Sequence, residues 1–221
     1  MGYVLYQIST WALPAVLAIT LHEAAHGHVA ALLGDDTAKR LGRVSLNPLR
    51  HIDPFGTVLL PGLLIFAGAP AFGYAKPVPV DYSRLASPRR DMMWVALAGP
   101  ATNLALAIAA ALGFHLVADG QGWFAANLVN ALSVNLVLAV FNMLPLPPLD
   151  GGRVAVGLLP DVLAFPLARF ERYGMPLLLI VLFLLPVAAG QAGIAIDPLG
   201  WLIWPPVDWL GRGILALAGH G

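Results

Sequence analysis

Long apolar stretches are the feature that most constrains how this chain can fold. A spanning α-helix needs about 20 mostly apolar residues, and five stretches of the 221-residue chain are candidates. These are residues 4–33, 92–118, 124–147, 174–190 and 196–217. Only 11% of the residues are charged, too few to cover a soluble surface, which carries about 25%. We therefore expect an all-α polytopic membrane protein that forms a single domain over residues 1–221.

A sixth apolar stretch, residues 55–73, differs from the other five. Pro61, Gly62, Gly68 and Pro70 interrupt it, and residues of these types break a helix. Irregular backbone at membrane depth must be buried in protein or line a cavity. We therefore predict that this stretch is a broken or re-entrant segment, and a tilted full crossing is the alternative.

The distribution of basic residues predicts the orientation of the chain. The turns at 118–123 and 190–196 and the N-terminus carry no Lys or Arg. Cytoplasmic loops are enriched in these residues. If residues 55–73 re-enter and the other five stretches span, all 12 basic residues are cytoplasmic. We thus expect a plasma-membrane protein with its N-terminus outside and its C-terminus in the cytoplasm. The basic residues are Lys39, Arg40, Arg43, Arg50, Lys76, Arg84, Arg89, Arg90, Arg153, Arg169, Arg172 and Arg212.

Charge balance and cysteine content exclude several functions. The 12 basic and 12 acidic residues cancel, so no net positive field attracts nucleic acid. The chain has no cysteine, which excludes disulfides, thiolate metal sites and a cysteine nucleophile. A bound metal would therefore need His, Asp or Glu ligands.

The first spanning stretch contains the motif His22-Glu23-Ala24-Ala25-His26. Four residues make about one helical turn, so the two histidines project from one face and can bind one Zn²⁺. Glu23 lies about 100° round the helix from His22 and is placed to hold a water as general base. The alternative is a pair of structural histidines that hydrogen-bond to carbonyl groups.

Asp150 is the best candidate for a third metal ligand. A catalytic zinc keeps three protein ligands and one water. Pro145, Pro147 and Pro148 break the chain before Asp150, and irregular backbone at this depth must be buried or line a cavity. The alternative is that Asp150 caps the next helix near Arg153.

The two motifs together resemble the site-2 proteases, which are intramembrane zinc metalloproteases. The resemblance rests on His22-Glu23-x-x-His26 and Asn142-x-x-Pro145-x-x-x-x-Asp150-Gly151. Other stretches are similar to a short bacterial branch without PDZ or CBS domains: Gly34-Asp35-x-Thr37-Ala38, Leu46-Asn47-Pro48-x-x-His51-Ile52-Asp53-Pro54, Ala75-Lys76-Pro77-Val78 and Ala98-Gly99-Pro100-x-x-Asn103. The resemblance implies that His22, His26 and Asp150 bind zinc, that Glu23 is the catalytic base, and that Asn103 and Asn142 line the substrate site.

The function we expect is that of an intramembrane zinc endopeptidase. Its substrates would be single-span membrane proteins, cut within or near their transmembrane segments, as in regulated intramembrane proteolysis. A membrane metal transporter that uses the same His and Asp cluster is one alternative. Transporters usually contain internal repeats, and this sequence shows none. A non-proteolytic scaffold that keeps zinc for structure is the other alternative.

Residues 74–82 predict a short extended strip. The prolines at 77 and 79 exclude a central strand and suit an edge. Such an edge can pair with an unwound substrate segment by strand addition. The alternative is a plain connector.

Overall fold

The structure is a computed structural model that describes residues 2–66, 73–117 and 122–220. Over these residues the protein is helical and contains no β-strand. The α-helices are α1 (Gly2–Leu32), α2 (Thr37–Arg40), α3 (Leu60–Phe66), α4 (Pro88–Gly113), α5 (Gly122–Asn142), α6 (Asp150–Leu158), α7 (Asp161–Leu179), α8 (Leu185–Gln191), α9 (Pro198–Leu202) and α10 (Trp204–Leu217). The 3₁₀ turns are η1 (Pro48–Arg50), η3 (Tyr82–Arg84) and η4 (Phe114–Leu116), and the π-helical segments are η2 (Pro54–Leu59) and η5 (Ile180–Leu184).

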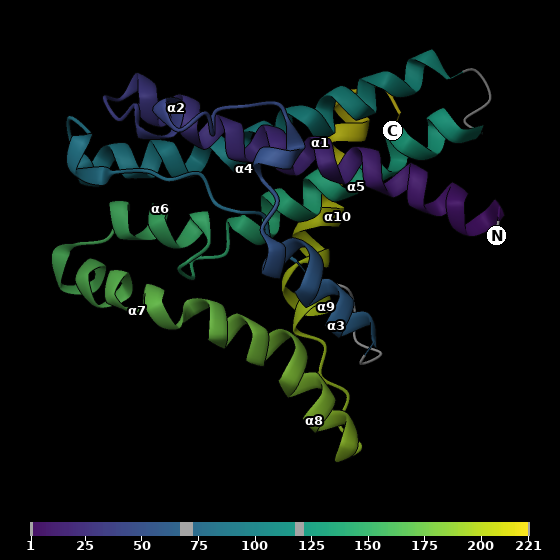
Figure 1. The fold of residues 1–221 in the computed structure, drawn as a ribbon. Coiled ribbons are helices and arrows are strands. Elements are labelled where there is room, and N and C mark those ends of the chain that lie inside the picture. The colour runs from purple at the N-terminus through teal and green to yellow at the C-terminus, as the bar shows by residue number, and fades with distance from the viewer. Residues whose placement is uncertain (1, 67–72, 118–121, 221) are drawn as a thin grey trace.

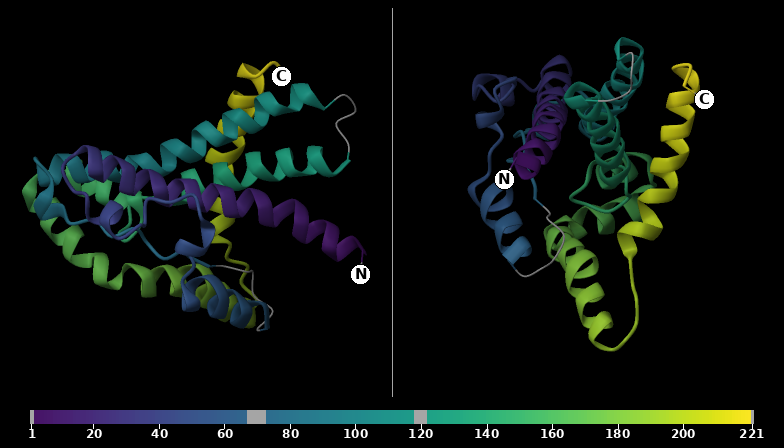
Figure 2. Two further views of the ribbon diagram at one scale, coloured as in Figure 1. Left: turned by 45° about the horizontal axis from the view of Figure 1, so that its top comes forward. Right: turned by 90° about the vertical axis from the view of Figure 1, so that its right-hand side faces the viewer.

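Helices α1, α4 and α5 pack against one another and form the centre of the molecule (Figure 1). Ala18 and Ala107 are fully buried in this packing. Small residues let helix backbones approach closely where lipid removes the hydrophobic driving force. Helix α6 packs on α4, and α7 packs on α6. Figure 2 shows α7 and α8 extending away from the central helices.

Side-chain amides connect the three central helices inside this apolar packing. Asn103 of α4 donates from Nδ2 to Asn135 Oδ1 of α5, at 2.8 Å. Asn130 of α5 donates from Nδ2 to the carbonyl of Thr10 in α1, at 2.9 Å. An unsatisfied polar group is costly in such surroundings, so these bonds fix how the helices pack.

Four helical segments are long and apolar enough to cross a membrane: Gly2–Leu32, Pro88–Leu116, Gly122–Asn142 and Asp161–Gln191. They include four of the five predicted spans. The fifth, residues 196–217, divides into α9 and the 14-residue α10. The Asp197 side chain accepts from the Gly200 N–H at the start of α9, and the proline pair at 205–206 follows the start of α10. The predicted count of five spans is therefore not confirmed.

The predicted re-entrant stretch, residues 55–73, is described only in part. Segments η2 and α3 are helical from Pro54 to Phe66, and residues 67–72 lie outside the described residues. Asp53 begins η2, because its Oδ1 accepts from the N–H groups of Phe55 and Gly56. The helical part is shorter than the roughly 20 residues that a span requires. Whether this stretch returns to the side it enters stays a prediction.

The two chain ends lie at the same end of the central helices, near the end of α4 and the start of α5 (Figure 1). Near the C-terminus, His220 Nε2 lies 3.1 Å from the carbonyl oxygen of Ala111, close to the end of α4. At the start of α5, Trp123 donates from Nε1 to Ser9 Oγ of α1, at 2.8 Å. The prediction of an outer N-terminus and a cytoplasmic C-terminus is therefore not confirmed. It assumed five crossings, and an odd number puts the ends on opposite sides.

Residues 73–81 form neither helix nor strand, and Tyr82 begins η3, so the predicted extended strip is not confirmed as a strand. Its backbone nevertheless follows a period of two. The N–H groups of Tyr74 and Lys76 donate to Gly56 O (3.0 Å) and His51 O (2.8 Å). The N–H of Val78 donates to a side chain of α1. Alternate residues therefore hydrogen-bond to the protein body, as on one edge of an extended chain. We call residues 73–81 the strap.

The far end of the strap is fixed by a buried carboxylate. Asp35 is fully buried, and its Oδ2 accepts from the N–H of Asp81, at 2.7 Å. Thr37 donates to Asp35 Oδ1 from its N–H and its hydroxyl. Burial raises the pKa of Asp35, but the hydrogen bonds from Thr37 and Asp81 outweigh this effect and leave the pKa below its ordinary value. Asp35 is therefore ionised at neutral pH, as a stable acceptor for the strap.

Candidate metal centre

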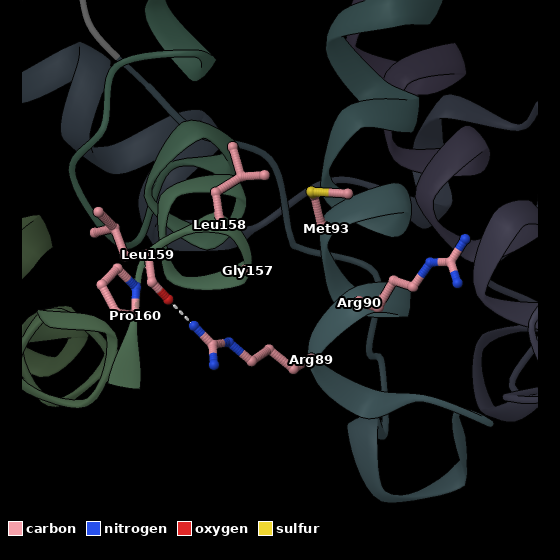
Figure 3. Close-up of a pocket in the computed structure, with 7 residues that line it drawn as sticks. All are labelled: Arg89, Arg90, Met93, Gly157, Leu158, Leu159 and Pro160. Carbon is pink, nitrogen blue, oxygen red and sulfur yellow. Dashed lines mark hydrogen bonds between the residues drawn. The ribbon is translucent and has the colours of Figure 1, made fainter. Parts of the chain in front are cut away.

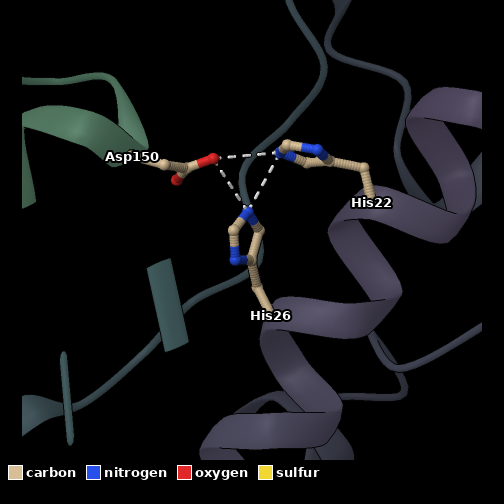
Figure 4. Close-up of side chains that lie close together, drawn as sticks. All are labelled: His22, His26 and Asp150. Atoms are coloured by element: carbon tan, nitrogen blue, oxygen red, sulfur yellow. Dashed lines mark hydrogen bonds and ion pairs between the residues drawn. The ribbon is translucent and has the colours of Figure 1, made fainter. Parts of the chain in front are cut away.

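Three buried side chains from two helices converge on one point (Figure 4). His22 and His26 project from the same face of α1, and Asp150 begins α6. The two Nε2 atoms are 3.0 Å apart. Asp150 Oδ2 lies 3.2 Å from Nε2 of His22 and 3.4 Å from Nε2 of His26. The spacing of the motif and the break before Asp150 thus bring together the three residues that the sequence predicts as ligands.

Hydrogen bonds to the other ring nitrogens determine the tautomer of both histidines. His22 Nδ1 lies 2.6 Å from Asn103 Oδ1, and Asn103 is oriented by its donation to Asn135. His26 Nδ1 lies 2.7 Å from the carbonyl oxygen of Val95. Both partners are acceptors, so Nδ1 carries the hydrogen on each ring. The Nε2 atoms then present lone pairs toward Asp150.

This donor set fits a metal cation. Two lone pairs and a carboxylate oxygen face one another, and a single added proton could satisfy only part of this arrangement. Asp150 Oδ2 is buried and, in the described part of the chain, has no hydrogen-bond partner. Nitrogen and oxygen ligands about 2.0–2.1 Å from a tetrahedral zinc lie about 3.3 Å from one another. The observed separations of 3.0–3.4 Å match that value, and a fourth position remains for water or substrate.

Gly99 of α4 has no side chain, and this leaves room for the imidazoles of His22 and His26. A Cβ at this position would lie 2.5 Å from His22 Cε1 and 2.6 Å from the Nε2 atoms of both histidines. The same helix supplies the Val95 carbonyl and the Asn103 amide on either side of Gly99. Helix α4 therefore both orients the histidine rings and provides the room in front of them.

Backbone packing places Asp150 at the start of α6. A Cβ on Gly151 would collide with backbone atoms of Met143 and Leu144, and one on Gly152 with those of Pro147. The two glycines let α6 begin directly against the loop that follows α5. The N-cap position of α6 is held by Leu149 and not by Asp150, and no described group donates to Asp150 Oδ2. The alternative in which Asp150 serves as a cap is therefore not observed among the described residues.

Glu23 lies next to the donor cluster and is half-buried. Its Oε2 accepts from the backbone N–H of Val78 in the strap, at 2.8 Å. Among the described residues, no hydrogen bond is made to its Oε1. One carboxylate oxygen is thus held by the strap, and the other remains available for proton transfer.

The two predicted substrate-site amides occupy different surroundings. Asn103 is fully buried, with Oδ1 beside His22 and Nδ2 donating to Asn135. Asn142 is half-buried, and its Nδ2 donates to the Leu138 carbonyl in its own helix, at 3.0 Å. The contacts of Asn103 are those of a residue that orients a histidine. For both residues a role in substrate binding stays a prediction.

Several groups that contact the metal centre or orient its residues are not among the site residues that the sequence predicts. The Val95 carbonyl and the Val78 N–H are backbone groups, so no residue type marks them in the sequence. Gly99 occurs in one of the stretches that resemble site-2 proteases, but only the packing reveals why a side chain is excluded there. Asn135 is one of four asparagines in α5, and its sequence position does not show that it orients Asn103.

Two cavities lie away from the metal centre. One of about 520 Å³ opens beside the start of α4 and the turn from α6 to α7. Figure 3 shows Arg89 there, which donates to the carbonyl oxygens of Val156 and Leu159. A second cavity, of about 380 Å³, lies between the first turns of α1 and α5. Neither is lined by a residue of the metal centre.

Comparison with known proteins agrees with this centre. A protein-family model described as peptidase family M50 matches residues 118–185, which include Asp150. The "Putative zinc metalloprotease YwhC" of Bacillus subtilis is 37% identical over 204 residues, 87% of this chain and 83% of that protein. The "Putative zinc metalloprotease Rip2" of Mycolicibacterium smegmatis is 30% identical over 190 residues, 84% of this chain and 69% of that protein. No solved structure matches the chain.

Proposed function

Since the chain belongs to peptidase family M50, the site-2 protease family of membrane metalloproteases, we propose that it is an intramembrane zinc endopeptidase. Its substrates are single-span membrane proteins, cut within or near their transmembrane segments. The observation that carries the proposal is the convergence of two imidazole lone pairs and a carboxylate oxygen beside a free oxygen of Glu23.

The chemistry follows from the roles of these side chains. His22, His26 and Asp150 would hold the zinc. When bound, zinc lowers the pKa of a water molecule and polarises the scissile carbonyl. Glu23 takes a proton from the attacking water on the oxygen that Val78 leaves free, and delivers it to the leaving amine. Asn103 and Val95 keep both imidazoles in the tautomer that ligates.

Orientation follows from where the basic residues gather. Ion pairs link α2 to η3 (Asp36–Arg84) and α4 to α7 (Arg89–Asp161) at one end of the molecule. We place this end in the cytoplasm, since cytoplasmic segments concentrate Lys and Arg. Both chain ends then face outside. His22 precedes the end of α1 by ten residues, about 15 Å along the axis, so the centre lies within the membrane on the cytoplasmic side.

We place the unwound substrate segment along the outer edge of the strap. The inner edge is already paired through Tyr74, Lys76 and Val78. On the outer edge, Pro77 and Pro79 have no N–H to donate. This edge therefore presents the N–H of Ala75 and carbonyl acceptors, of which that of Pro77 also accepts from Arg43 at 3.4 Å. A substrate strand there would donate most of the hydrogen bonds. The strap contacts Glu23, so this docking would bring the substrate backbone close to the catalytic base.

The deciding experiment uses the purified full chain in detergent and in liposomes. We expect zinc in about equimolar amount and cleavage of a labelled single-span substrate inside its apolar segment, mapped by mass spectrometry. A chelator should stop cleavage and added zinc should restore it. A protein that binds zinc but cuts none of a panel of single-span substrates would contradict the proposal. Metal movement across the same liposomes would then favour the transporter, and its absence the scaffold.

The proposed orientation predicts which side chains are reached from outside the cell. The chain has no cysteine, so each introduced cysteine reports one position. We expect Tyr3→Cys and His220→Cys to react with a membrane-impermeant maleimide on intact cells. Lys39→Cys should react only after permeabilisation. Labelling of Lys39→Cys on intact cells would reverse the orientation, and labelling of only one terminus would contradict the placement of both ends outside.

The docking edge predicts a loss of cleavage without a loss of zinc. The double substitution Ala75→Asp and Pro79→Asp puts two charges on the outer edge of the strap. It leaves in place the hydrogen bonds donated by the N–H groups of Tyr74, Lys76 and Val78. We expect KM to rise by about tenfold or more, because buried charge opposes docking of an apolar strand. Zinc content should stay at the wild-type value. Unchanged KM in this variant would show that the substrate docks elsewhere.

A further inference from the structure

Arg43 is a buried cation with no carboxylate partner. It is 9% exposed, and its Nε is a buried donor without a partner in the described part of the chain. Among the described residues, no carboxylate oxygen lies within 4.0 Å of a guanidinium nitrogen of Arg43. A buried unpaired charge is costly, and a neutral side chain could fill this space at lower cost. The positive charge therefore calls for an explanation in terms of what it contacts.

The guanidinium contacts the strap directly before the residue that holds Glu23. Arg43 Nη2 donates to the Lys76 carbonyl at 2.8 Å and to the Pro77 carbonyl at 3.4 Å. A charged donor makes such bonds shorter and stronger than a neutral one. The next peptide N–H along the chain that can donate is that of Val78, because Pro77 has none, and it donates to Glu23 Oε2.

The strap also packs tightly on α1 at this point. A Cβ on Gly27 would lie 2.8 Å from Val44 Cγ2 and 3.0 Å from Val78 Cγ1. The residue after Arg43 and the residue that holds Glu23 therefore pack on the same turn of α1, one turn beyond Glu23. Arg43, the strap and the general base form one continuous set of contacts.

We propose that Arg43 is a positioning residue for Glu23. Its guanidinium fixes the carbonyls of Lys76 and Pro77, so that the Val78 N–H holds Oε2 of Glu23 and the carboxylate presents Oε1 to the reacting water. The positive charge strengthens the hydrogen bonds to these two carbonyls. Among the described residues, the strap has no neighbouring strand that could hold them instead. The inference rests on the proposed peptidase function, and it assigns the orientation of the base to a residue outside the zinc motifs.

The test separates orientation of the base from folding and from metal binding. Arg43→Gln is compared with Lys39→Gln, which removes the same charge from an exposed side chain of α2, outside the strap and the metal centre. Misplacement of a catalytic group by about 1 Å costs about 10²-fold in rate. We expect kcat of Arg43→Gln to fall by about 10²-fold, with KM and zinc content within twofold of wild type. Arg43→Lys, which keeps a charged donor, should recover part of the loss, and Lys39→Gln should stay within twofold.

Hydrogen–deuterium exchange of the strap gives a readout that does not depend on activity. Pro77 and Pro79 have no amide hydrogen, so a peptide over this region reports few amides. We expect exchange at Lys76 and Val78 to rise at least tenfold in Arg43→Gln. Glu23→Ala should raise exchange at Val78 alone, because Lys76 donates to His51. Lys39→Gln should leave both amides protected.

Two results would overturn the inference. One is wild-type protection of Val78 in Arg43→Gln together with kcat within twofold of wild type. The other is a parallel fall of kcat, zinc content and thermal stability with no change at the strap amides, which would make Arg43 a general structural residue. If the wild-type chain cleaves no substrate, the peptidase function fails, and the exchange measurements still decide whether Arg43 holds the strap against Glu23.

Discussion

Glu23→Gln is expected to abolish peptide hydrolysis while the protein keeps its zinc. Gln has nearly the shape of Glu and can still accept the Val78 N–H through its amide oxygen, but it cannot take a proton from water. General-base catalysis contributes about 10²–10⁴-fold, so kcat should fall by that range or more. Glu23 is not among the three converging donors, so zinc per protein should stay at the wild-type value. Single-turnover cleavage and metal analysis of the same preparation measure both quantities.

The chain offers a matched control for this substitution. Glu171 is the only other glutamate, and its side chain is exposed and paired with Arg153 at 3.0 Å. An exposed pair of this kind contributes about 0–1 kcal/mol. Glu171→Gln should therefore keep its activity within twofold and its zinc unchanged. If Glu23→Gln cleaves as fast as Glu171→Gln, Glu23 is not the base. If it loses its zinc, its role is in the metal centre and not in proton transfer.

The convergence of His22, His26 and Asp150 could be predicted from the sequence because each member has a local cause. His22 and His26 share a helix face through their four-residue spacing, and Asp150 follows a run of prolines that no helix accommodates. The structure brings all three together within 4.8 Å. Helical periodicity and prolines act over short distances, so they are visible in a single sequence.

The remaining features depend on contacts between segments far apart in the chain. The Val78 N–H meets Glu23 across 55 positions, and Arg43 meets Lys76 across 33. Neither backbone groups nor one arginine among 12 basic residues has a pattern that predicts such contacts. The predicted fifth span is not confirmed for a related reason. Hydropathy indicates that residues 196–217 are apolar, but it does not show that Asp197 and the following prolines divide them into two helices.

Gly99→Ala is expected to remove zinc from the folded protein. The added Cβ would lie 2.6 Å from both ligating nitrogens, closer than side-chain carbons approach other atoms. Helix α4 is held on both sides by its bonds to His22 and His26, so the imidazoles must turn away from Asp150. Disturbing the partners of metal ligands costs about 10–100-fold in affinity, and a direct obstruction should cost at least as much. Zinc affinity, measured by competition with a chromophoric chelator, checks this directly.

A second glycine substitution separates this obstruction from a general effect on helix packing. Gly211 lies in α10, where an added Cβ would approach only Leu136 Cδ1, at 3.4 Å. Alanine is favoured over glycine in a helix by about 1 kcal/mol, so neither substitution should lower the helical content of the zinc-free protein. Gly211→Ala should keep wild-type zinc affinity, and Gly99→Ala should match it in thermal stability only after chelation. Wild-type zinc affinity in Gly99→Ala would mean that the metal does not lie between His22, His26 and Asp150. In that case the convergence of their three lone pairs would need another cation or a shared proton.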